Sequence, residues 1–502
     1  MTDAARGAPV ASLASAAAEV AVVSAVPKQL RIGSAWLDSE AHAALAVEDP
    51  STGETLADVA DASPADGIAA LDAAHRAQQA WARTAPRTRS EILRRGYEAL
   101  TAAAPQLALL ITLEMGKPLA DSLWEVGYAA EFFRWYAEET VRADGTYSPS
   151  PAGAGRILTM RQPVGPALLI TPWNLPLAMA TRKLGAALAA GCTTILKPAE
   201  QTPLTALALT EIMLASGVPD GVVNTVNTSE PAALVAALMA DSRLRKVSFT
   251  GSTDVGRLLI SQSAAQILRI SLELGGNAPF LVFEDADLPA AVEGAVLAKM
   301  RTNGEACTAA NRLYVDHRVA EEFTERLAAR LAGMRVGRGT EPDVETGPLI
   351  DEAATCHLDG LVRDAESRGA RAVTGGNRVQ RAGHFFEPTL LSGVSADARM
   401  LHEEIFGPVA PVVSFRDDEE ALGAANNTQY GLAAYVYTRD LGRALRVAER
   451  LECGMVALNQ GTVANAAAPF GGIKHSGFGR EGGREGIGDY LSTKYVAISL
   501  PD

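Results

Sequence analysis

The spacing of hydrophobic and polar residues in the N-terminal part of the chain predicts helices. From Pro64 to about Arg142 the sequence favours successive helices. The segment Ser63-Pro64-Ala65-Asp66 has a capping serine, a proline at the first helical position and an acidic residue three positions after the cap. Gly116, followed by Pro118, predicts the end of one helix at Met115. The next predicted helix, from Leu119 to Val141, is rich in aromatic residues.

After about residue 163 short apolar runs alternate with helical stretches. We predict strands at 165–171, 193–198, 221–226 and 246–251. Helices are expected near 176–190, from Thr202-Pro203, near 230–240 and near 254–265. Short continuous apolar strands that alternate with helices indicate a parallel sheet covered on both faces.

A second series of the same kind begins near Glu273. Its predicted strands are 279–283, 370–376, 407–415, 432–438 and 453–459, and its helices lie near 288–301, 319–334, 351–368, 417–427 and 441–451. The C-terminal segment STKYVAISL has strand composition and no helix after it. The predicted fold class is therefore α/β, with two doubly wound Rossmann-like domains, and the last strand is expected to complete a sheet elsewhere, such as one in a neighbouring subunit.

Composition and charge exclude several classes of protein. Hydrophobic residues make up 48% of the 502 residues and charged residues 21%, which argues against intrinsic disorder. Lys and Arg number 45 against 59 Asp and Glu, so the net charge of −14 argues against a nucleic-acid surface. No apolar stretch has the character of a membrane-spanning helix. The first 27 residues, rich in Ala, Ser and Val, are interpreted as a mobile arm.

The four cysteines do not form a disulfide framework or a zinc motif. Cys192, Cys356 and Cys453 fit best as ordinary thiols, and no metal site is predicted. A reducing, cytoplasmic location is expected. Cys307 differs because it follows a turn that contains Gly304, and such a thiol can face a cleft. From this spacing alone a structural role for Cys307 stays open.

Several other motifs point to a ligand, each with an ordinary alternative. Gly251-Ser252 follows a strand and opens a helix, which suits a phosphate or is an ordinary strand–helix turn. Lys197 and Glu200 follow a buried strand, where they would bind ribose hydroxyls or lie in solvent. Glu273 stands beside two glycines, and Asn174 ends an apolar strand, where an amide can donate to a ligand.

Together these segments resemble one known family. TPWN at 171–174, KPAE at 197–200, FTGST at 249–253, ELGGN at 273–277, NGEAC at 303–307 and EEIFGP at 403–408 match the NAD(P)-dependent aldehyde dehydrogenase superfamily in order and spacing. The resemblance covers about residues 28–502. It implies an NAD-binding domain from 28–144 and 164–272, a catalytic domain from 273–462, and a small β oligomerisation element from 145–163 and 486–502. A homodimer or homotetramer is expected.

The resemblance also implies the catalytic roles. Cys307 would attack the aldehyde carbon, and Asn174 with the Cys307 amide would stabilise the oxyanion. Glu273 would activate the water that hydrolyses the thioester. Relatives that release their product to coenzyme A lack this glutamate, so the free acid is the expected product.

The expected cofactor is NAD rather than NADP, because a carboxylate at Glu200 pairs with a free 2′-hydroxyl and repels a 2′-phosphate. Lys197 would bind the same ribose, and Ser252 with the amides after Gly251 would bind the pyrophosphate. The full set of cofactor-binding residues that the resemblance implies is Thr171, Pro172, Trp173, Lys197, Glu200, Phe249, Gly251, Ser252, Leu274, Gly275, Glu404 and Phe406.

The substrate prediction depends on two arginines. Arg182 and Arg301 resemble the pair that binds the distal carboxylate in the succinate-semialdehyde dehydrogenase branch, and the guanidinium fork suits a carboxylate. The alternative for each is an ion pair with a structural glutamate. Ala464 stands where this branch usually has a serine that also contacts the carboxylate. That departure puts the substrate in doubt.

The sequence departs from the family pattern at two further positions, and three alternative functions stay open. Thr302 replaces a common asparagine, and Ala309 excludes the regulatory disulfide that some members form beside the nucleophile. The alternatives are oxidation of another aliphatic, hydroxylated or aromatic aldehyde, a catalytically silent protein on the same fold, and a thiol hydrolase without cofactor.

Overall fold

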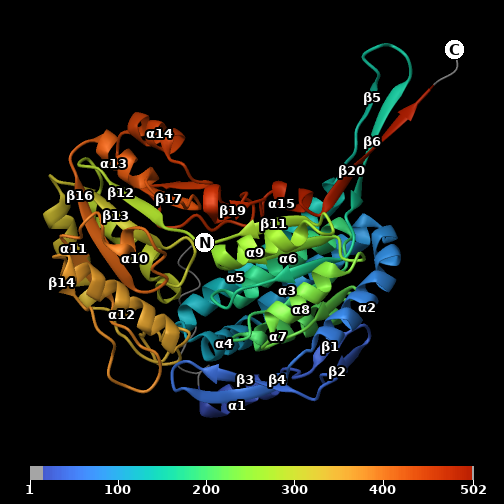
Figure 1. Cartoon of the computed structure of the whole chain (residues 1–502), viewed down its shortest axis with the longest axis horizontal. Helices are drawn as coiled ribbons and strands as arrows, with labels where there is room; N and C mark the ends of the chain where they lie inside the picture. Colours follow the sequence, from blue (N-terminus) through green and yellow to red (C-terminus); the bar gives the residue numbers. More distant parts are fainter. Residues whose placement is uncertain (1–14, 500–502) are drawn as a thin grey trace.

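Two open sheets with helices on both faces make up most of residues 15–499, which are the residues that the computed structural model describes (Figure 1). This confirms the predicted α/β fold with two Rossmann-like units. The first sheet has eight strands, in the order β19 (Gly477–Phe478), β11 (Arg269–Glu273), β10 (Lys246–Thr250), β7 (Ala167–Ile170), β8 (Thr194–Lys197), β9 (Val223–Thr225), β1 (Leu30–Ile32) and β2 (Ala35–Leu37).

The strand order of this sheet reverses beside β7. From β7 the chain builds outward through β8 and β9, then returns to place β10 and β11 on the other side, all in parallel. The edge strand β19 pairs antiparallel with β11, and β1, which lies beside the edge strand β2, pairs antiparallel with β9. A doubly wound sheet forms a crevice at such a reversal, outside the carboxyl ends of the strands. The segments after β7 and β10 therefore border a ready-made ligand site.

The helices predicted around this sheet are confirmed. They are α2 (Pro64–Arg83), α3 (Pro86–Ala102), α4 (Ala104–Met115), α5 (Leu119–Glu139), α6 (Pro176–Ala190), α7 (Pro203–Ala215), α8 (Pro231–Ala240) and α9 (Thr253–Ser263). Ser63 and Asp66 form the expected capping box. Gly116 ends α4 with a φ of 90°, a conformation that glycine adopts without steric cost.

The N-terminal segment is a correction. Helix α1 (Ala16–Ser24) replaces part of the mobile arm predicted over residues 1–27, and residues 1–14 lie outside the described residues. Alanine is the strongest helix former, so the low-complexity composition itself favours a helix here. Ser15 caps it, Val23 is buried, and Glu19 lies 3.0 Å from Nη2 of Arg338. These contacts hold the segment on the body of the protein.

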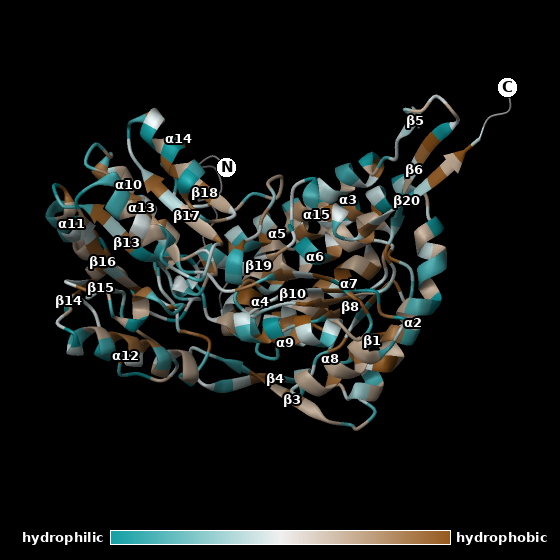
Figure 2. Ribbon diagram, turned by 45° about the horizontal axis from the view of Figure 1, so that its top comes forward, coloured by the Kyte–Doolittle hydropathy of each residue, from teal (hydrophilic) through white to brown (hydrophobic). Residues whose placement is uncertain are grey.

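The second sheet has seven strands, parallel except for the β14–β15 pair. Their order is β14 (Arg371–Thr374), β15 (Thr389–Ser392), β16 (Val409–Phe415), β13 (Ala310–Asp316), β12 (Ala278–Val282), β17 (Ala433–Tyr437) and β18 (Met455–Leu458). Its helices are α10 (Leu288–Met300), α11 (Ala320–Ala332), α12 (Glu352–Ser367), α13 (Asp418–Asn426) and α14 (Leu441–Arg450). Brown and teal alternate along α12 in Figure 2, as expected for a helix with one buried face.

Strands β11, β13 and β15 were not among the predicted elements. In β13 the sequence ANRLYVD looks partly polar, yet all seven residues are buried. Arg312 lies within this strand, where its guanidinium donates to the main-chain oxygens of Asn277, Ala424 and Ala425 at 2.9–3.0 Å. Hydropathy patterns miss such a strand, because a polar side chain can be buried when its hydrogen bonds are satisfied.

A three-stranded antiparallel sheet extends away from both units, at the upper right of Figure 1. It contains β5 (Tyr147–Pro149), β6 (Arg156–Pro163) and β20 (Leu491–Ile498). The predicted C-terminal strand is thus confirmed, while its role in assembly stays a prediction. The remaining elements are the ribbon β3 (Ala44–Asp49) and β4 (Glu54–Ala60), the short helix α15 (Glu485–Gly488), and the 3-10 turns Thr140–Arg142, Arg301–Gly304, Arg399–Leu401 and Lys474–Ser476. Among residues 15–499, no helix is both long and apolar enough to cross a bilayer.

Candidate active site

A cavity of about 330 Å³ opens at the reversal point of the first sheet. Of the predicted cofactor-binding residues it is lined by Thr171, Pro172, Trp173, Lys197, Glu200, Phe249 and Gly251. Lys197 is buried, and burial lowers the pKa of its ammonium. Its Nζ lies 3.2 Å from Oε2 of the half-exposed Glu200. The pair presents one cation and one carboxylate at the mouth of the cavity.

The N-terminus of α9 borders the same cavity. Ser252 caps the helix, and its Oγ accepts a hydrogen bond from the Val255 amide at 3.4 Å. The first amides of a helix and its dipole suit an anionic group. A Cβ on Gly251 would lie 2.4 Å from the Phe249 ring, so a side chain there would displace the ring that lines the cavity. These features fit the pyrophosphate of a dinucleotide.

The other predicted cofactor residues meet where the two units face each other. Glu404 Oε1 accepts a hydrogen bond from the Gly276 amide at 3.0 Å, and burial raises the pKa of Glu404 to about 7. A Cβ on Gly275 would lie 2.7 Å from the Glu404 carboxylate, so a side chain there would displace that carboxylate. Phe406 packs edge-on against Trp173, with ring centroids 5.4 Å apart. Leu274 is buried and packs on α9. The segments that follow β7 and β11 therefore contact the segment that precedes β16.

Cys307 is presented by a strained turn. Thr302, Asn303 and Gly304 all have positive φ, of 57°, 58° and 77°. Strain of this kind persists where the surroundings fix it. Here Asn303 Oδ1 accepts from the Gly347 amide, and its Nδ2 donates to the Pro348 oxygen, both at 2.7 Å. The Thr302 amide donates to Asp121, also at 2.7 Å.

The thiol of Cys307 is protonated in this environment. Burial raises its pKa to about 12, Arg182 opposes the shift, and Glu404 and Glu273 add to it. Because the thiolate is the nucleophilic form, a nearby base must take the proton when the thiol reacts. The charge of Glu273 acts on Cys307, which makes Glu273 the candidate for that base.

Asn174 is tied to the same turn as Cys307. Its Nδ2 donates to the Glu305 oxygen at 2.8 Å, and its Oδ1 accepts from the Leu175 amide at 3.0 Å. Its main-chain oxygen accepts from the Nζ of Lys117 at 2.8 Å. Because an amide carries two N–H groups, the second remains available to a ligand.

Glu273 ends β11 with its side chain buried. Neither carboxylate oxygen has a hydrogen-bond partner among the described residues. Burial raises the pKa of Glu273 well above its ordinary value, the charge of Glu481 raises it further, and Arg182 and Lys183 oppose this. A buried carboxyl with a raised pKa and free oxygens is suited to accept protons near neutral pH.

Glu481 was missed by the sequence reasoning. Its carboxylate lies 2.5 Å from Nε of Arg182 and 2.5 Å from Nζ of Lys183, and Ser248 Oγ donates to it at 3.2 Å. Burial opposes ionisation, but Lys183 and Arg182 together lower the pKa of Glu481. A single glutamate in a glycine-rich loop gives no sequence signal, because its partners lie far away in the chain.

Arg182 was predicted to bind a substrate carboxylate, and this role stays a prediction. In the structure it forms a buried ion pair with Glu481, the kind of contact that was the alternative for this residue. Its Cζ also lies 4.2 Å from the centre of the Phe470 ring. Glu481 thus compensates the positive charge of Arg182, although Nη1 of Arg182 has no hydrogen-bond partner among residues 15–499.

Arg301 differs from Arg182. Its Cζ lies 4.0 Å from the centre of the Trp124 ring, and its Nη1 donates to Thr462 Oγ1 at 3.3 Å. It forms no ion pair with any carboxylate in the described part of the chain. Arg301 and Cys307 both act on the pKa of Tyr435, which burial raises to about 12. Tyr435 Oη donates to the Thr308 oxygen at 2.8 Å, so Arg301 and Cys307 both lie near this tyrosine.

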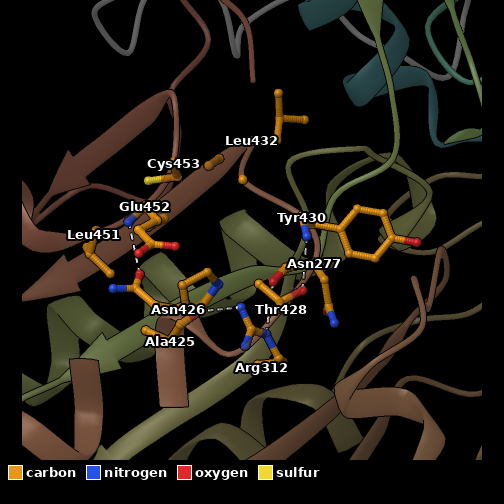
Figure 3. Close-up of a pocket in the computed structure, with 14 residues that line it drawn as sticks. Asn277, Arg312, Ala425, Asn426, Thr428, Tyr430, Leu432, Leu451, Glu452 and Cys453 are labelled. Atoms are coloured by element: carbon orange, nitrogen blue, oxygen red, sulfur yellow. Dashed lines mark hydrogen bonds between the residues drawn. The ribbon is translucent and has the colours of Figure 1, made fainter. Parts of the chain in front are cut away.

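A second cavity, of about 610 Å³, lies beside α5 and the loop that contains Ala464. Trp124, Tyr128 and Asn465 also line it, so the predicted Ala464 position does face a cavity near Arg301. A smaller cavity of about 10 Å³, drawn in Figure 3, is lined by Arg312 and Tyr430 among other residues. It has room for no more than about one water molecule, so its contribution is structural.

The chain was compared with known proteins and family models. The family model described as the aldehyde dehydrogenase family matches residues 36–496. A succinate-semialdehyde dehydrogenase of Paenarthrobacter nicotinovorans is 56% identical over 89% of this chain and 99% of that protein. GabD, the NADP(+) succinate-semialdehyde dehydrogenase of Escherichia coli (strain K12), is 47% identical over 94% of this chain and 98% of that protein.

A solved structure gives the same result. Betaine aldehyde dehydrogenase of Staphylococcus aureus in complex with NAD+ superposes with a TM-score of 0.93 and is 32% identical, covering 95% of this chain and 96% of that one. The architecture, the convergence of the six motifs and these matches agree. The chain belongs to the aldehyde dehydrogenase family, an oxidoreductase family that uses NAD(P).

Proposed function

We propose that the protein oxidises succinate semialdehyde to succinate with NAD as the preferred hydride acceptor. Oxidation of an aldehyde follows from family membership. The observation that carries the choice of substrate is Arg301, a guanidinium with no ion pair among the described residues that stacks on Trp124 at the edge of a cavity. A distal carboxylate on the aldehyde would complete its ion pair. The two relatives named as succinate-semialdehyde dehydrogenases support the same substrate.

Acylation begins when Cys307 Sγ bonds to the aldehyde carbon and the thiol proton passes to Glu273. The resulting oxyanion accepts hydrogen bonds from the free N–H of Asn174 and from the Cys307 amide. Loss of one such donor typically costs ~10²–10³ in rate. Bound NAD supplies the hydride acceptor. Loss of hydride from the former aldehyde carbon leaves a thioester on Cys307.

Deacylation uses the same carboxylate. Once the thioester has formed, Glu273 releases the thiol proton to solvent and then takes a proton from water as the water oxygen bonds to the acyl carbon. The C–S bond then breaks, Cys307 recovers a proton, and the carboxylate product leaves. General-base help of this kind contributes about 10²–10⁴ in rate. The buried position and unpaired oxygens of Glu273 support this role.

The preference for NAD over NADP rests on Glu200. Its carboxylate is placed beside Lys197, where it would accept a hydrogen bond from a ribose 2′-hydroxyl and repel a 2′-phosphate. The relative from Escherichia coli is named for NADP(+), whereas the Staphylococcus aureus structure holds NAD+. Comparing kcat/KM for both cofactors tests the preference. Glu200→Gln should raise the NADP/NAD ratio, and an unchanged ratio would contradict this role.

We also propose how the protein assembles and where it works. The projecting sheet of β5, β6 and β20 forms the contact of a homodimer or homotetramer, and the enzyme works in the cytoplasm. The first is supported by the exposed side chains of β20, which pair with β6 and project from the body.

The substrate is tested with a panel of aldehydes at saturating NAD. Succinate semialdehyde should give a higher kcat/KM than butanal, which has the same carbon chain and no carboxylate. Arg301→Leu should remove most of this difference, because the distal carboxylate loses its cation. If neutral, hydroxylated or aromatic aldehydes are better substrates and Arg301→Leu does not change the ranking, the substrate assignment fails.

A further inference from the structure

Three aromatic rings form a column along α5. Trp124, Tyr128 and Phe132 are spaced by four residues, which places them on one face of the helix. The Trp124 and Tyr128 rings are stacked, with centroids 5.2 Å apart and an angle of 20° between planes. Tyr128 and Phe132 meet edge-on at 4.8 Å. The column borders the cavity that contains the Ala464 loop.

An arginine lies at each end of this column, but the two are held differently. At the Phe132 end, Arg182 is fixed by its ion pair with Glu481 and by Phe470. At the Trp124 end, the contacts of Arg301 are the indole face at 4.0 Å and a 3.3 Å hydrogen bond to Thr462. The second arginine therefore depends on an aromatic ring for its orientation.

The position of Arg301 matters because it begins the strained turn that leads to Cys307. A long side chain with a single hydrogen bond would otherwise sample several rotamers, and fixing such a side chain upon binding costs about 0.5–1.5 kcal/mol. A guanidinium stacked on an indole is already oriented and keeps its edge N–H groups available for a carboxylate. Stacking thus prepares the cation without neutralising it.

We propose that Trp124 is a positioning residue that holds the Arg301 guanidinium for the distal carboxylate and so sets the preference for carboxylated over neutral aldehydes. This inference rests on the proposed function. It concerns a residue on α5, whereas the family motifs lie on the strands and loops around the cofactor. Trp124 acts through Arg301 and takes no part in the bond changes at Cys307.

The test compares Trp124→Leu with Trp124→Phe, using succinate semialdehyde and butanal as a matched pair of substrates. Trp124→Leu removes the aromatic face and should raise KM for succinate semialdehyde by about three- to thirtyfold, with little effect on kcat. Its KM for butanal should change less than about twofold. Trp124→Phe keeps an aromatic face and should restore most of the preference. If Trp124→Leu does not fold, Trp124→Met is the second non-aromatic replacement.

Two controls make the result specific. Trp36 packs on Arg31 in another arginine–tryptophan pair, outside the α5 cavity, so Trp36→Leu should leave the substrate ratio unchanged. In an Arg301→Leu background, Trp124→Leu should have no further effect on the ratio, because the residue it positions is gone. Equal losses for both aldehydes, or no loss with Trp124→Leu, would overturn the proposal. A wild-type enzyme that does not favour succinate semialdehyde would overturn the proposed function and this inference together, whereas a loss with Arg301→Leu alone would overturn only this inference.

Discussion

At the scale of single residues, burial and neighbouring charges shift the pKa values of the groups in the candidate active site. Cys307 and Glu273 are each pushed toward their neutral forms, while Glu481 is kept ionised by two buried cations. A neutral thiol is stable until a substrate arrives, and the ionised fraction of Glu273 is the form that can then accept its proton. In the proposed mechanism, reactivity is gained through proton transfer to Glu273 instead of through a permanently ionised sulfur.

This arrangement predicts an unusual pH dependence for alkylation of Cys307 in the cofactor-free enzyme. Burial disfavours the thiolate and raises the pKa to about 12, so the thiolate fraction increases about tenfold per pH unit at lower pH. The rate of modification by iodoacetamide should therefore rise through about pH 10 without a plateau. Peptide mass spectrometry separates Cys307 from the exposed Cys356.

Arg182→Met should slow the same alkylation, because the guanidinium charge favours the thiolate. A plateau near about pH 9, as an ordinary thiol would give, contradicts the burial account.

At the scale of secondary-structure elements, the catalytic groups are fixed by buried polar side chains that join helix ends to loops. Glu125 on α5 accepts hydrogen bonds from the Leu177 and Ala178 amides at 2.8 and 3.0 Å and so caps α6. Lys117 pairs with Glu125 and also donates to the Asn174 oxygen. One buried ion pair thereby positions the start of α6 together with Asn174, the proposed oxyanion donor.

Lys117→Met should reduce both stability and turnover. It leaves Glu125 as an uncompensated buried charge, and breaking one side of such a pair typically costs about 3–5 kcal/mol. It also frees the Asn174 main chain, so kcat should fall more than KM rises. Urea unfolding and steady-state kinetics measure the two effects.

The double variant Lys117→Met with Glu125→Gln is the control. It removes the unpaired charge while Gln can still accept from the α6 amides, so it should recover part of the stability. A single variant as stable as the wild type would show that the pair does not fix this region.

Sequence patterns predicted the elements that obey simple rules. Continuous apolar strands such as 194–197 and helices bounded by Pro and Gly, such as α6, were found where expected. The patterns failed at α1, where alanine-rich sequence was taken for disorder, and at β13, where Arg312 concealed a buried strand. Both failures arise because contacts distant in the chain satisfy polar groups or cover apolar ones.

The site was predicted mainly through the family resemblance, which did not reveal how its charged groups pair between distant segments of the chain. The structure brings Cys307, Glu273 and Asn174 to one region, as the motifs suggested. It assigns Arg182 to Glu481, which no local pattern could reveal, since the two residues lie in separate segments of the chain. Hydropathy and motif spacing identify the groups present but not which charges neutralise one another.

At the scale of the whole molecule, two α/β units enclose the site and a third small sheet projects from them (Figure 1). In this sheet β20 and β5 are the edge strands, and β6 lies between them. Exposed strand edges readily pair with another chain, and natural proteins otherwise cover or shorten them. A second copy of this chain is the partner that we expect at this sheet.

Deleting the residues from Ser492 onward should therefore disrupt assembly. The truncation removes nearly all of β20 and leaves β6 unpaired on that side. Size-exclusion chromatography with light scattering should show a dimer or tetramer for the full chain, and a monomer or aggregate for the truncated chain. Elution of the truncated protein as the native oligomer would contradict the role of this sheet.

The identity of the acyl-carrying residue is the central claim, and acid quenching during turnover tests it most directly. Enzyme mixed with NAD and succinate semialdehyde is quenched, digested and examined by mass spectrometry. We expect a succinyl group on the peptide that contains Cys307 and on no peptide with Cys192, Cys356 or Cys453, and no NADH formation by Cys307→Ala. Acylation of another cysteine, or NADH formation by Cys307→Ala at the wild-type rate, would contradict the account.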